Sequence, residues 1–162
     1  PRSTLWPYRR VFRSAGCRGM VGGQSLDLGA VGKQLDIAEL EDMHIHKTGA
    51  LIRAAVLLGA LSSDTLDAKA RKSLDHYGKC IGLAFQVQDD ILDVTASTEE
   101  LGKQAGADTA LNKPTYPALL GLAGARERAR ELHEDAADSL AGFGAQADPL
   151  RWLSRYIVDR SH

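Results

Sequence analysis

The 162-residue sequence has few cysteines, few aromatic residues and no long apolar run. Cys17 and Cys80 have no spacing that suggests a metal site or a disulfide framework, which favours free thiols in a reducing cytoplasm. No stretch approaches the ~18 apolar residues of a membrane span, and no apolar segment of a secretory signal follows the early basic residues. Aromatic residues make up 6% of the chain, whereas Ala and Leu are common, which favours helices over a β-sandwich.

Acidic residues are absent from the first 26 positions. Five arginines there give a formal charge of +5, and because the whole chain carries −1, the remainder carries −6. An acidic body argues against nucleic acid as the main partner and is compatible with a carboxylate metal site. Residues 1–15 lack a helical or strand period, so we expect a disordered or cloning-derived lead before a domain over residues 16–162.

Apolar residues at helical spacing predict four helices, over residues 37–61, 66–94, 116–140 and 149–158. Asp36 is the candidate N-cap of the first, and residues 62–64 are predicted to end it and to cap the second. No helix or strand is predicted over the Gly-rich residues 20–28, and residues 95–114 are predicted to form a polar loop. The sequence therefore predicts an all-α fold of long antiparallel helices.

The segment FQVQDDILD, residues 85–93, places Gln86, Asp89 and Asp93 on one face of a helix, with Asp90 beside them. Two carboxylates one turn apart can hold Mg²⁺, which prefers oxygen ligands and shares them with substrate phosphates. The alternative is a solvated acidic turn. The interleaved apolar residues weaken that alternative, because like charges on a buried helix repel unless a cation neutralises them.

Lys47 interrupts the apolar stripe of the helix predicted over residues 37–61. A buried lysine without a partner is costly, so we expect Lys47 to face an anionic cavity; the alternative is a lysine that snorkels at the rim. Thr48 adds a hydroxyl beside it, and Gly49 permits close approach of another helix. His44 and His46 cannot share one helical face, so we interpret them as packing or rim residues.

These motifs together resemble the trans-isoprenyl diphosphate synthases, in the bacterial farnesyl/geranyl diphosphate synthase branch. The matching stretches are residues 19–27, 46–53, 85–93, 101–103, 113–117 and 156–160. The resemblance implies an isoprenoid synthase-type helical bundle around a deep cavity. There, with Mg²⁺ or Mn²⁺, an allylic diphosphate would lose diphosphate and condense with isopentenyl diphosphate. It also implies a cytoplasmic homodimer for the full-length form.

The resemblance also implies the parts that individual side chains play. The implied metal ligands are Asp89, Asp90 and Asp93. The implied diphosphate-binding residues are Lys47, Lys103 and Lys113. The side chains implied to lie beside the reacting carbons are Thr48 and Gln86. The remaining cavity residues implied are Gln24, Asp27 and Phe85, with Asp27 orienting Lys47.

One departure from the family is large. The first aspartate-rich motif and the residues that bind isopentenyl diphosphate are missing, and family chains are much longer. One hypothesis is that the chain is the C-terminal half of a prenyltransferase and is inactive alone. The other is a degenerate, non-catalytic homologue that acts as a helical binding or oligomerisation module. Half a bundle should expose a large apolar patch or oligomerise.

Overall fold

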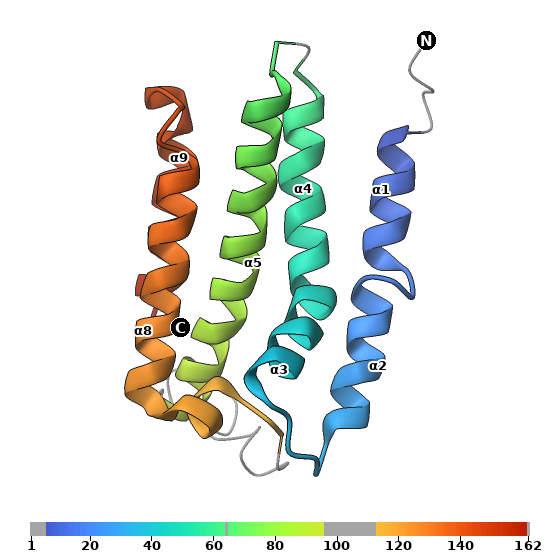
Figure 1. The fold of residues 1–162 in the computed structure, drawn as a ribbon, viewed down its shortest axis with the longest axis vertical. Coiled ribbons are helices and arrows are strands. Elements are labelled where there is room, and N and C mark those ends of the chain that lie inside the picture. Colours follow the sequence, from blue (N-terminus) through green and yellow to red (C-terminus); the bar gives the residue numbers. More distant parts are fainter. Residues whose placement is uncertain (1–5, 64, 96–112, 162) are drawn as a thin grey trace.

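The structure, a computed structural model, describes residues 6–63, 65–95 and 113–161, and all of its elements in these ranges are helical. The elements are α1 (Trp6–Ala15), α2 (Met20–Ala30), α3 (Ile37–His44), the π-turn η1 (Ile45–Gly49), α4 (Ala50–Leu61), α5 (Ala68–Thr95), α8 (Tyr116–Ser139), the 3₁₀ turn η2 (Ala145–Ala147) and α9 (Asp148–Asp159). The long helices run side by side as a bundle (Figure 1), which confirms the all-α prediction.

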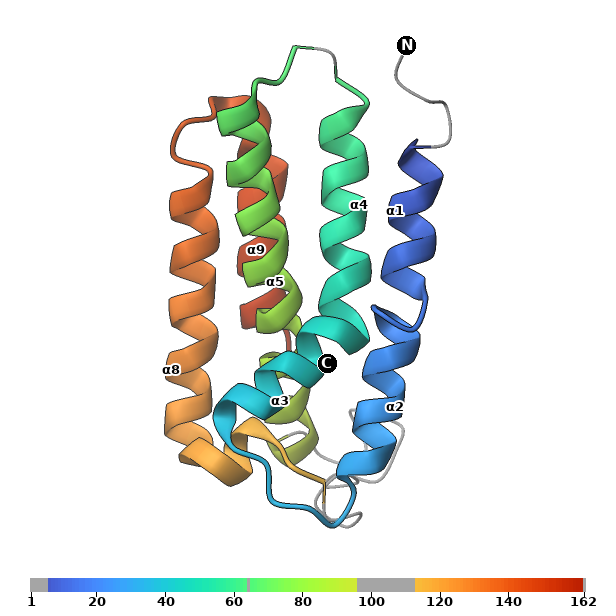
Figure 2. The same ribbon diagram turned by 45° about the vertical axis from the view of Figure 1, so that its right-hand side comes forward.

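Helix α5 is the central element of this bundle. It lies between α4 on one side and α8 with α9 on the other (Figures 1 and 2). The stripe predicted along it faces its neighbours, because the helical period turns those side chains to one side. Phe85 in this stripe is partly buried and the other members are buried: Leu74, Tyr77, Ile81, Gln88 and Leu92. The Tyr77 hydroxyl also donates a 2.7 Å hydrogen bond to the carbonyl of Leu150, which ties α5 to α9.

Local sequence signals predicted the start of one helix correctly and the start of another incorrectly. Asp36 caps α3 as predicted: the Glu39 amide donates to Asp36 Oδ1 at 2.8 Å, and the Asp36 amide donates to Glu39 Oε2 at 2.9 Å. The predicted cap of α5 at residues 62–64 is wrong. Ser62 is instead the C-cap of α4, and Asp67 accepts from the Ala70 amide at 2.7 Å in the first turn of α5.

Two helices form where the sequence predicts none. Helix α1 runs from Trp6 to Ala15, inside the segment expected to lack structure, and packs against α4. Helix α2 occupies the Gly-rich segment and packs against η1. A Cβ at Gly23 would lie 2.1 Å from the Lys47 backbone nitrogen, so this contact requires glycine. The buried residues of α2 are Gly23 and Ala30, which are too small to give an apolar period.

The π-turn η1 interrupts the single helix predicted over residues 37–61. Helices α3 and α4 continue directly into it, and it carries Lys47 and Thr48. A Cβ on Gly82 of α5 would lie 2.9 Å from Gly49 Cα, so α5 approaches the backbone of η1 closely here, as predicted for Gly49. A π-turn inserts one extra residue and is frequent at functional sites.

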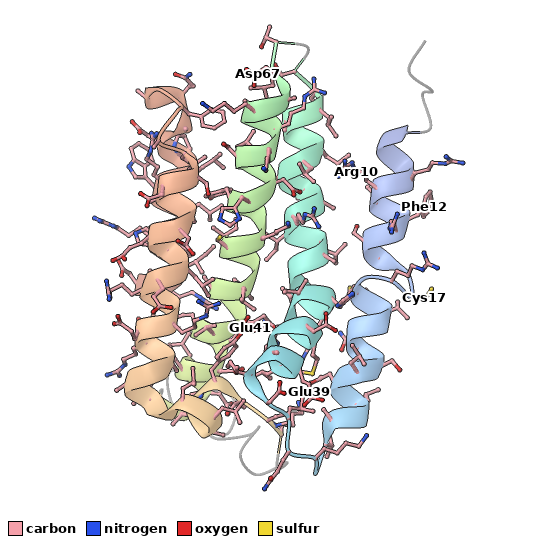
Figure 3. All side chains as sticks on the ribbon, in the orientation of Figure 1. Arg10, Phe12, Cys17, Glu39, Glu41 and Asp67 are labelled. Atoms are coloured by element: carbon pink, nitrogen blue, oxygen red, sulfur yellow. The ribbon has the colours of Figure 1, made fainter. Side chains whose placement is uncertain are left out.

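Several large apolar side chains are exposed on α1, on α2 and directly after α2. They are Val11, Phe12, Val21, Leu26, Leu28 and Val31. Phe12 points away from α4 (Figure 3), and these exposed side chains agree with the apolar surface expected of half a bundle. Across the described ranges, no helix combines the length and apolar character needed to cross a membrane.

Candidate functional site

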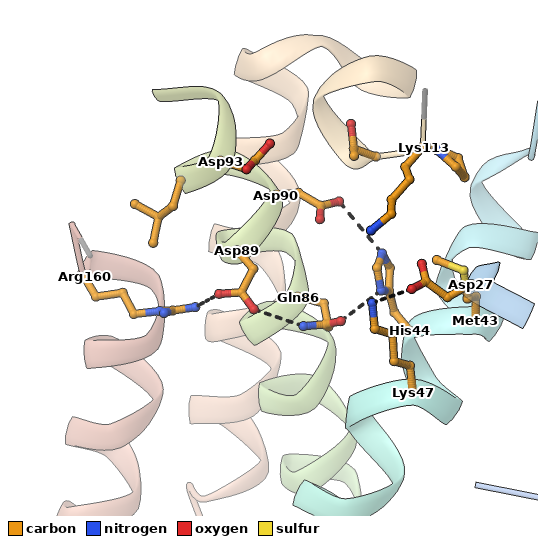
Figure 4. Close-up of a pocket in the computed structure, with 13 residues that line it drawn as sticks. Asp27, Met43, His44, Lys47, Gln86, Asp89, Asp90, Asp93, Lys113 and Arg160 are labelled. Carbon is orange, nitrogen blue, oxygen red and sulfur yellow. Dashed lines mark hydrogen bonds and ion pairs between the residues drawn. The ribbon is translucent and has the colours of Figure 1, made fainter. Parts of the chain in front are cut away.

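A cavity of about 370 Å³ opens where α2, η1 and the C-terminal half of α5 meet the start of α8 and the residue that follows α9 (Figure 4). Seven residues singled out from the sequence line it: Asp27, Lys47, Gln86, Asp89, Asp90, Asp93 and Lys113. They come from separate parts of the chain, so the fold collects carboxylates and lysines around one space.

Gln86 is oriented by its neighbours. Its Nε2 donates to Asp89 Oδ2 at 3.1 Å, and because a carboxylate only accepts, the amide nitrogen must face Asp89. The amide oxygen therefore faces His44, whose Nδ1 lies 3.1 Å away and must donate the hydrogen bond. Figure 4 shows this chain from His44 through Gln86 to Asp89. The cavity wall thus holds Gln86 in one rotamer and one amide orientation.

His44 and Asp90 join the start of α8 to the cavity. His44 is buried, stacks on the Tyr116 ring at a centroid distance of 5.7 Å, and places Nε2 3.8 Å from Asp90 Oδ2. That Asp90 oxygen accepts the Tyr116 backbone N–H at 2.9 Å. Burial, followed by the nearby Glu41 carboxylate, raises the pKa of the Tyr116 hydroxyl far above its ordinary value, so the ring stays neutral. His44 therefore packs, as interpreted, and also forms part of the cavity wall.

Lys47 lies in the cavity opposite Asp27. Its Nζ donates to Asp27 Oδ2 at 3.0 Å, and both side chains are partly buried. The ion pair spans η1 and α2 at the level where Gly23 lets the two backbones touch. The lysine is therefore directed by a carboxylate on another element rather than snorkelling to bulk solvent.

Sequence reasoning missed Arg160, which follows α9. Its guanidinium forms an ion pair with Asp89 Oδ1 and lies 4.4 Å from the centroid of the Phe85 ring. Gln88 Nε2 donates a 2.9 Å hydrogen bond to the Arg160 carbonyl. Arg160 and Asp89 are 71 positions apart, so no local period relates them. The available signal was a single arginine at the end of the last matching stretch.

Four other predicted site residues fall outside this cavity or outside the described ranges. Gln24 is exposed on α2, and the guanidinium of Arg160 covers the Phe85 ring. Neither residue lines this cavity, and their part in the site stays a prediction. Thr48 belongs to η1 beside Lys47 but is not a lining residue. Lys103 lies outside the described residues.

The donor set fits a hard divalent cation. Asp89, Asp90 and Asp93 present carboxylate oxygens to the cavity, and Gln86 adds an amide. Within the described ranges, no three His, Cys, Asp or Glu residues are grouped closely enough to hold a metal by themselves. A cation held by one or two carboxylates and completed by water or phosphate is the usual arrangement for Mg²⁺.

Comparison with known proteins shows which family the chain belongs to. A family model described as Polyprenyl synthetase matches residues 10–141. The chain belongs to the polyprenyl synthetase family. The farnesyl diphosphate synthase of Escherichia coli (strain K12) is 54% identical over 151 residues, which cover 91% of this chain and 50% of that protein. The family match also begins before residue 16, where the sequence placed the domain boundary.

Solved structures of polyprenyl synthetases and related enzymes share the fold. A geranyltransferase from Helicobacter pylori, complexed with magnesium and isoprenyl diphosphate, matches with a TM-score of 0.80 and 31% identity, over 96% of this chain and 50% of that one. A polyprenyl synthase from Caulobacter crescentus CB15, complexed with calcium and isoprenyl diphosphate, gives 0.89 and 26%, over 98% and 60%. The chain spans about half the length of the curated relatives it matches.

Proposed function

We propose that residues 16–162 supply the C-terminal half of an isoprenyl diphosphate synthase of the farnesyl diphosphate synthase type. The whole enzyme condenses an allylic diphosphate with isopentenyl diphosphate and releases diphosphate. The observation that carries this proposal is the cavity in which Asp89 and Asp93 lie together with Lys47 and Lys113. Family membership and the half-length coverage of relatives support it.

Mg²⁺, with Mn²⁺ as a substitute, is the cofactor of the proposed reaction. Asp89 and Asp93 are its proposed ligands, with Asp90 in support. The bound cation supplies positive charge that stabilises the departing diphosphate. The magnesium and isoprenyl diphosphate found together in the Helicobacter pylori geranyltransferase support this assignment.

The lysines bind the leaving diphosphate in this proposal. Lys47, fixed by Asp27, and Lys113 present ammonium groups to the cavity. Lys103, outside the described residues, is proposed as a third diphosphate-binding lysine. A diphosphate that leaves an allylic carbon gains negative charge, and cations already in place stabilise that charge without reorganising. Gln86, locked between Asp89 and His44, and Thr48 are proposed to steady the allylic cation or the departing proton.

The chain alone should be inactive, because its sequence has no first aspartate-rich motif. We expect no farnesyl diphosphate from geranyl diphosphate, isopentenyl diphosphate and Mg²⁺ with the purified 162-residue protein. Measurable turnover would contradict this expectation.

A chimera tests the proposal directly. Residues 16–162 replace the corresponding half of the Escherichia coli farnesyl diphosphate synthase, and product formation is measured. We expect turnover, and a loss in kcat of about 100-fold or more in the Asp89→Asn chimera. Asp138→Asn, which changes an exposed carboxylate on α8, should have no effect. A folded chimera without turnover would instead favour the degenerate, non-catalytic module.

A further inference from the structure

A second cavity, of about 540 Å³, lies between α1 and α4. Five arginines line it, four from α1 and the turn after it and one from α4: Arg9, Arg10, Arg13, Arg18 and Arg53. Apart from Arg53, the α4 side of this cavity is lined by small and apolar side chains. This arginine groove shares no lining residue with the cavity around Asp89.

Arg10 of helix α1 faces α4, whereas Arg9 and Arg13 are exposed at the edge of the groove. Helical spacing places Arg9, Arg10 and Arg13 on one side and Val11 and Phe12 on the other. Arg10 lies on the side that faces α4, whereas Phe12 points away from α4 and is 73% exposed (Figure 3). A surface helix ordinarily packs apolar residues against its neighbour, whereas α1 sets Arg10 there and leaves Val11 and Phe12 exposed. The groove thus concentrates positive charge in a concave space.

The chain itself neutralises only part of this charge. Arg53 makes a bidentate pair with Asp75, through hydrogen bonds of 2.6 and 2.8 Å. Arg9, Arg13 and Arg18 form no hydrogen bond or ion pair with any described residue. The first 26 residues contain no acidic side chain that could approach them. Neighbouring like charges repel, and an anion from solution would remove that repulsion.

We propose that the arginine groove binds a small anion with several phosphate oxygens, of the size of diphosphate or triphosphate. Guanidinium groups match phosphate oxygens as paired donors, and several of them converge here. The groove is bounded by two helices, which suits a compact polyphosphate better than an extended nucleic acid strand or a membrane surface. This site is separate from the diphosphate position proposed beside Lys47.

Calorimetric titration with inorganic tripolyphosphate tests the proposal. The whole chain is used with EDTA, so that divalent cations cannot bridge the anion to Asp89. We expect Arg9→Gln/Arg13→Gln to bind about tenfold more weakly than the unchanged chain. One matched pair should keep the affinity within about twofold: Arg126→Gln/Arg155→Gln, which removes exposed arginines elsewhere. Lys47→Gln/Lys113→Gln is measured beside it and reports any binding of the anion at the other cavity.

Three results would overturn the proposal. The first is no binding by the unchanged chain. The second is a loss confined to the lysine pair, or equal in the Arg126/Arg155 pair. The third is a short thymidine strand that binds more tightly than tripolyphosphate and depends on Arg9 and Arg13. Circular dichroism of each variant shows whether the helices persist. The lysine pair reports on the cavity around Asp89, so failure of the arginine-groove proposal is distinguished from failure of the proposed function.

Discussion

Interior carboxylates in this chain are balanced by basic residues from distant positions. Asp27 pairs with Lys47, and Asp75 pairs with Arg53. Asp89 pairs with Arg160, and Glu41 pairs with Arg128. A partly buried charge costs free energy unless it is paired and hydrogen-bonded, so each pair fixes how two elements sit together. The pair at Asp89 also means that Arg160 would share this carboxylate with any cation bound there.

The Asp75–Arg53 pair leads to a prediction about pH. Burial raises the pKa of Asp75, but the hydrogen bonds and charge of Arg53, with help from Lys79, outweigh it and hold the pKa below the ordinary 3.8. A lowered carboxyl pKa stabilises the fold above pH 3.8, and this stabilisation is lost as the pH falls through the lower, folded-state value. Asp75→Asn should therefore cost about 1–2 kcal/mol at pH 7 and much less near pH 3.

Urea unfolding at both pH values measures this difference. Asp138→Asn is the matched control, because Asp138 is exposed on α8 and its loss should change the unfolding free energy by less than about 0.5 kcal/mol. A deficit in Asp75→Asn that is as large at pH 3 as at pH 7 would show that shape, and not ionisation, matters at this position.

The same residues show what the sequence could and could not predict about the site. Gln86, Asp89 and Asp93 lie on one helix, so the helical period alone places them together. Lys47 stood out because a charge interrupts an apolar stripe. Arg160 gave no such signal, since its contact with Asp89 arises only when the segment after α9 meets α5. The hydrogen bond between His44 of α3 and Gln86 of α5 gave no signal either, because it joins two helices that are separate in the sequence.

At the scale of elements, long helices were predictable and small-residue contacts were not. Helices α5, α8 and α9 begin and end within a few residues of the predicted ranges, because apolar residues recur along them at helical spacing. Helix α2 buries Gly23 and Ala30, and α1 exposes Phe12, so neither has an apolar period turned toward the core. The expected loop over residues 95–114 falls mostly outside the described residues.

The close contact between α2 and η1 leads to a prediction about stability. A Cβ at Gly23 would lie 2.1 Å from the Lys47 nitrogen and 2.4 Å from its Cα, and backbone atoms cannot move aside cheaply. Gly23→Ala should therefore destabilise the fold by about 1–3 kcal/mol or more. It should also separate Lys47 from Asp27. Thermal unfolding, with the melting temperature as the readout, measures the loss.

Gly29→Ala is the control within the same helix. No atom lies within 4 Å of a Cβ built at Gly29, so alanine there should be neutral or should stabilise α2 by up to about 1 kcal/mol. Equal losses at both positions would mean that helix propensity matters and that the contact with η1 does not.

At the scale of the whole molecule, the bundle has one covered side and one apolar side. Helices α4, α8 and α9 surround α5, whereas α1 and α2 form an outer layer whose far face has no neighbour among the described residues (Figures 1 and 2). That face exposes Leu28 by 77% and Phe12 by 73%. The relatives are about twice as long as the segment matched here.

The apolar face of α1 and α2 should make the isolated chain self-associate. Burying exposed apolar area yields roughly 25 cal/mol per Å², so chains that hide this face against one another gain stability at micromolar concentrations and above. Phe12→Ser/Leu28→Ser should shift the sedimentation profile toward monomer and lower the binding of a hydrophobic dye, with little change in melting temperature because both side chains are exposed.

Trp152→Ser is the matched control: Trp152 is 69% exposed, but it lies on α9, across the bundle from α1 (Figure 1). A chain that stays monomeric at all concentrations would contradict the prediction, and association that only the Trp152 change weakens would place the associating surface on α9 instead.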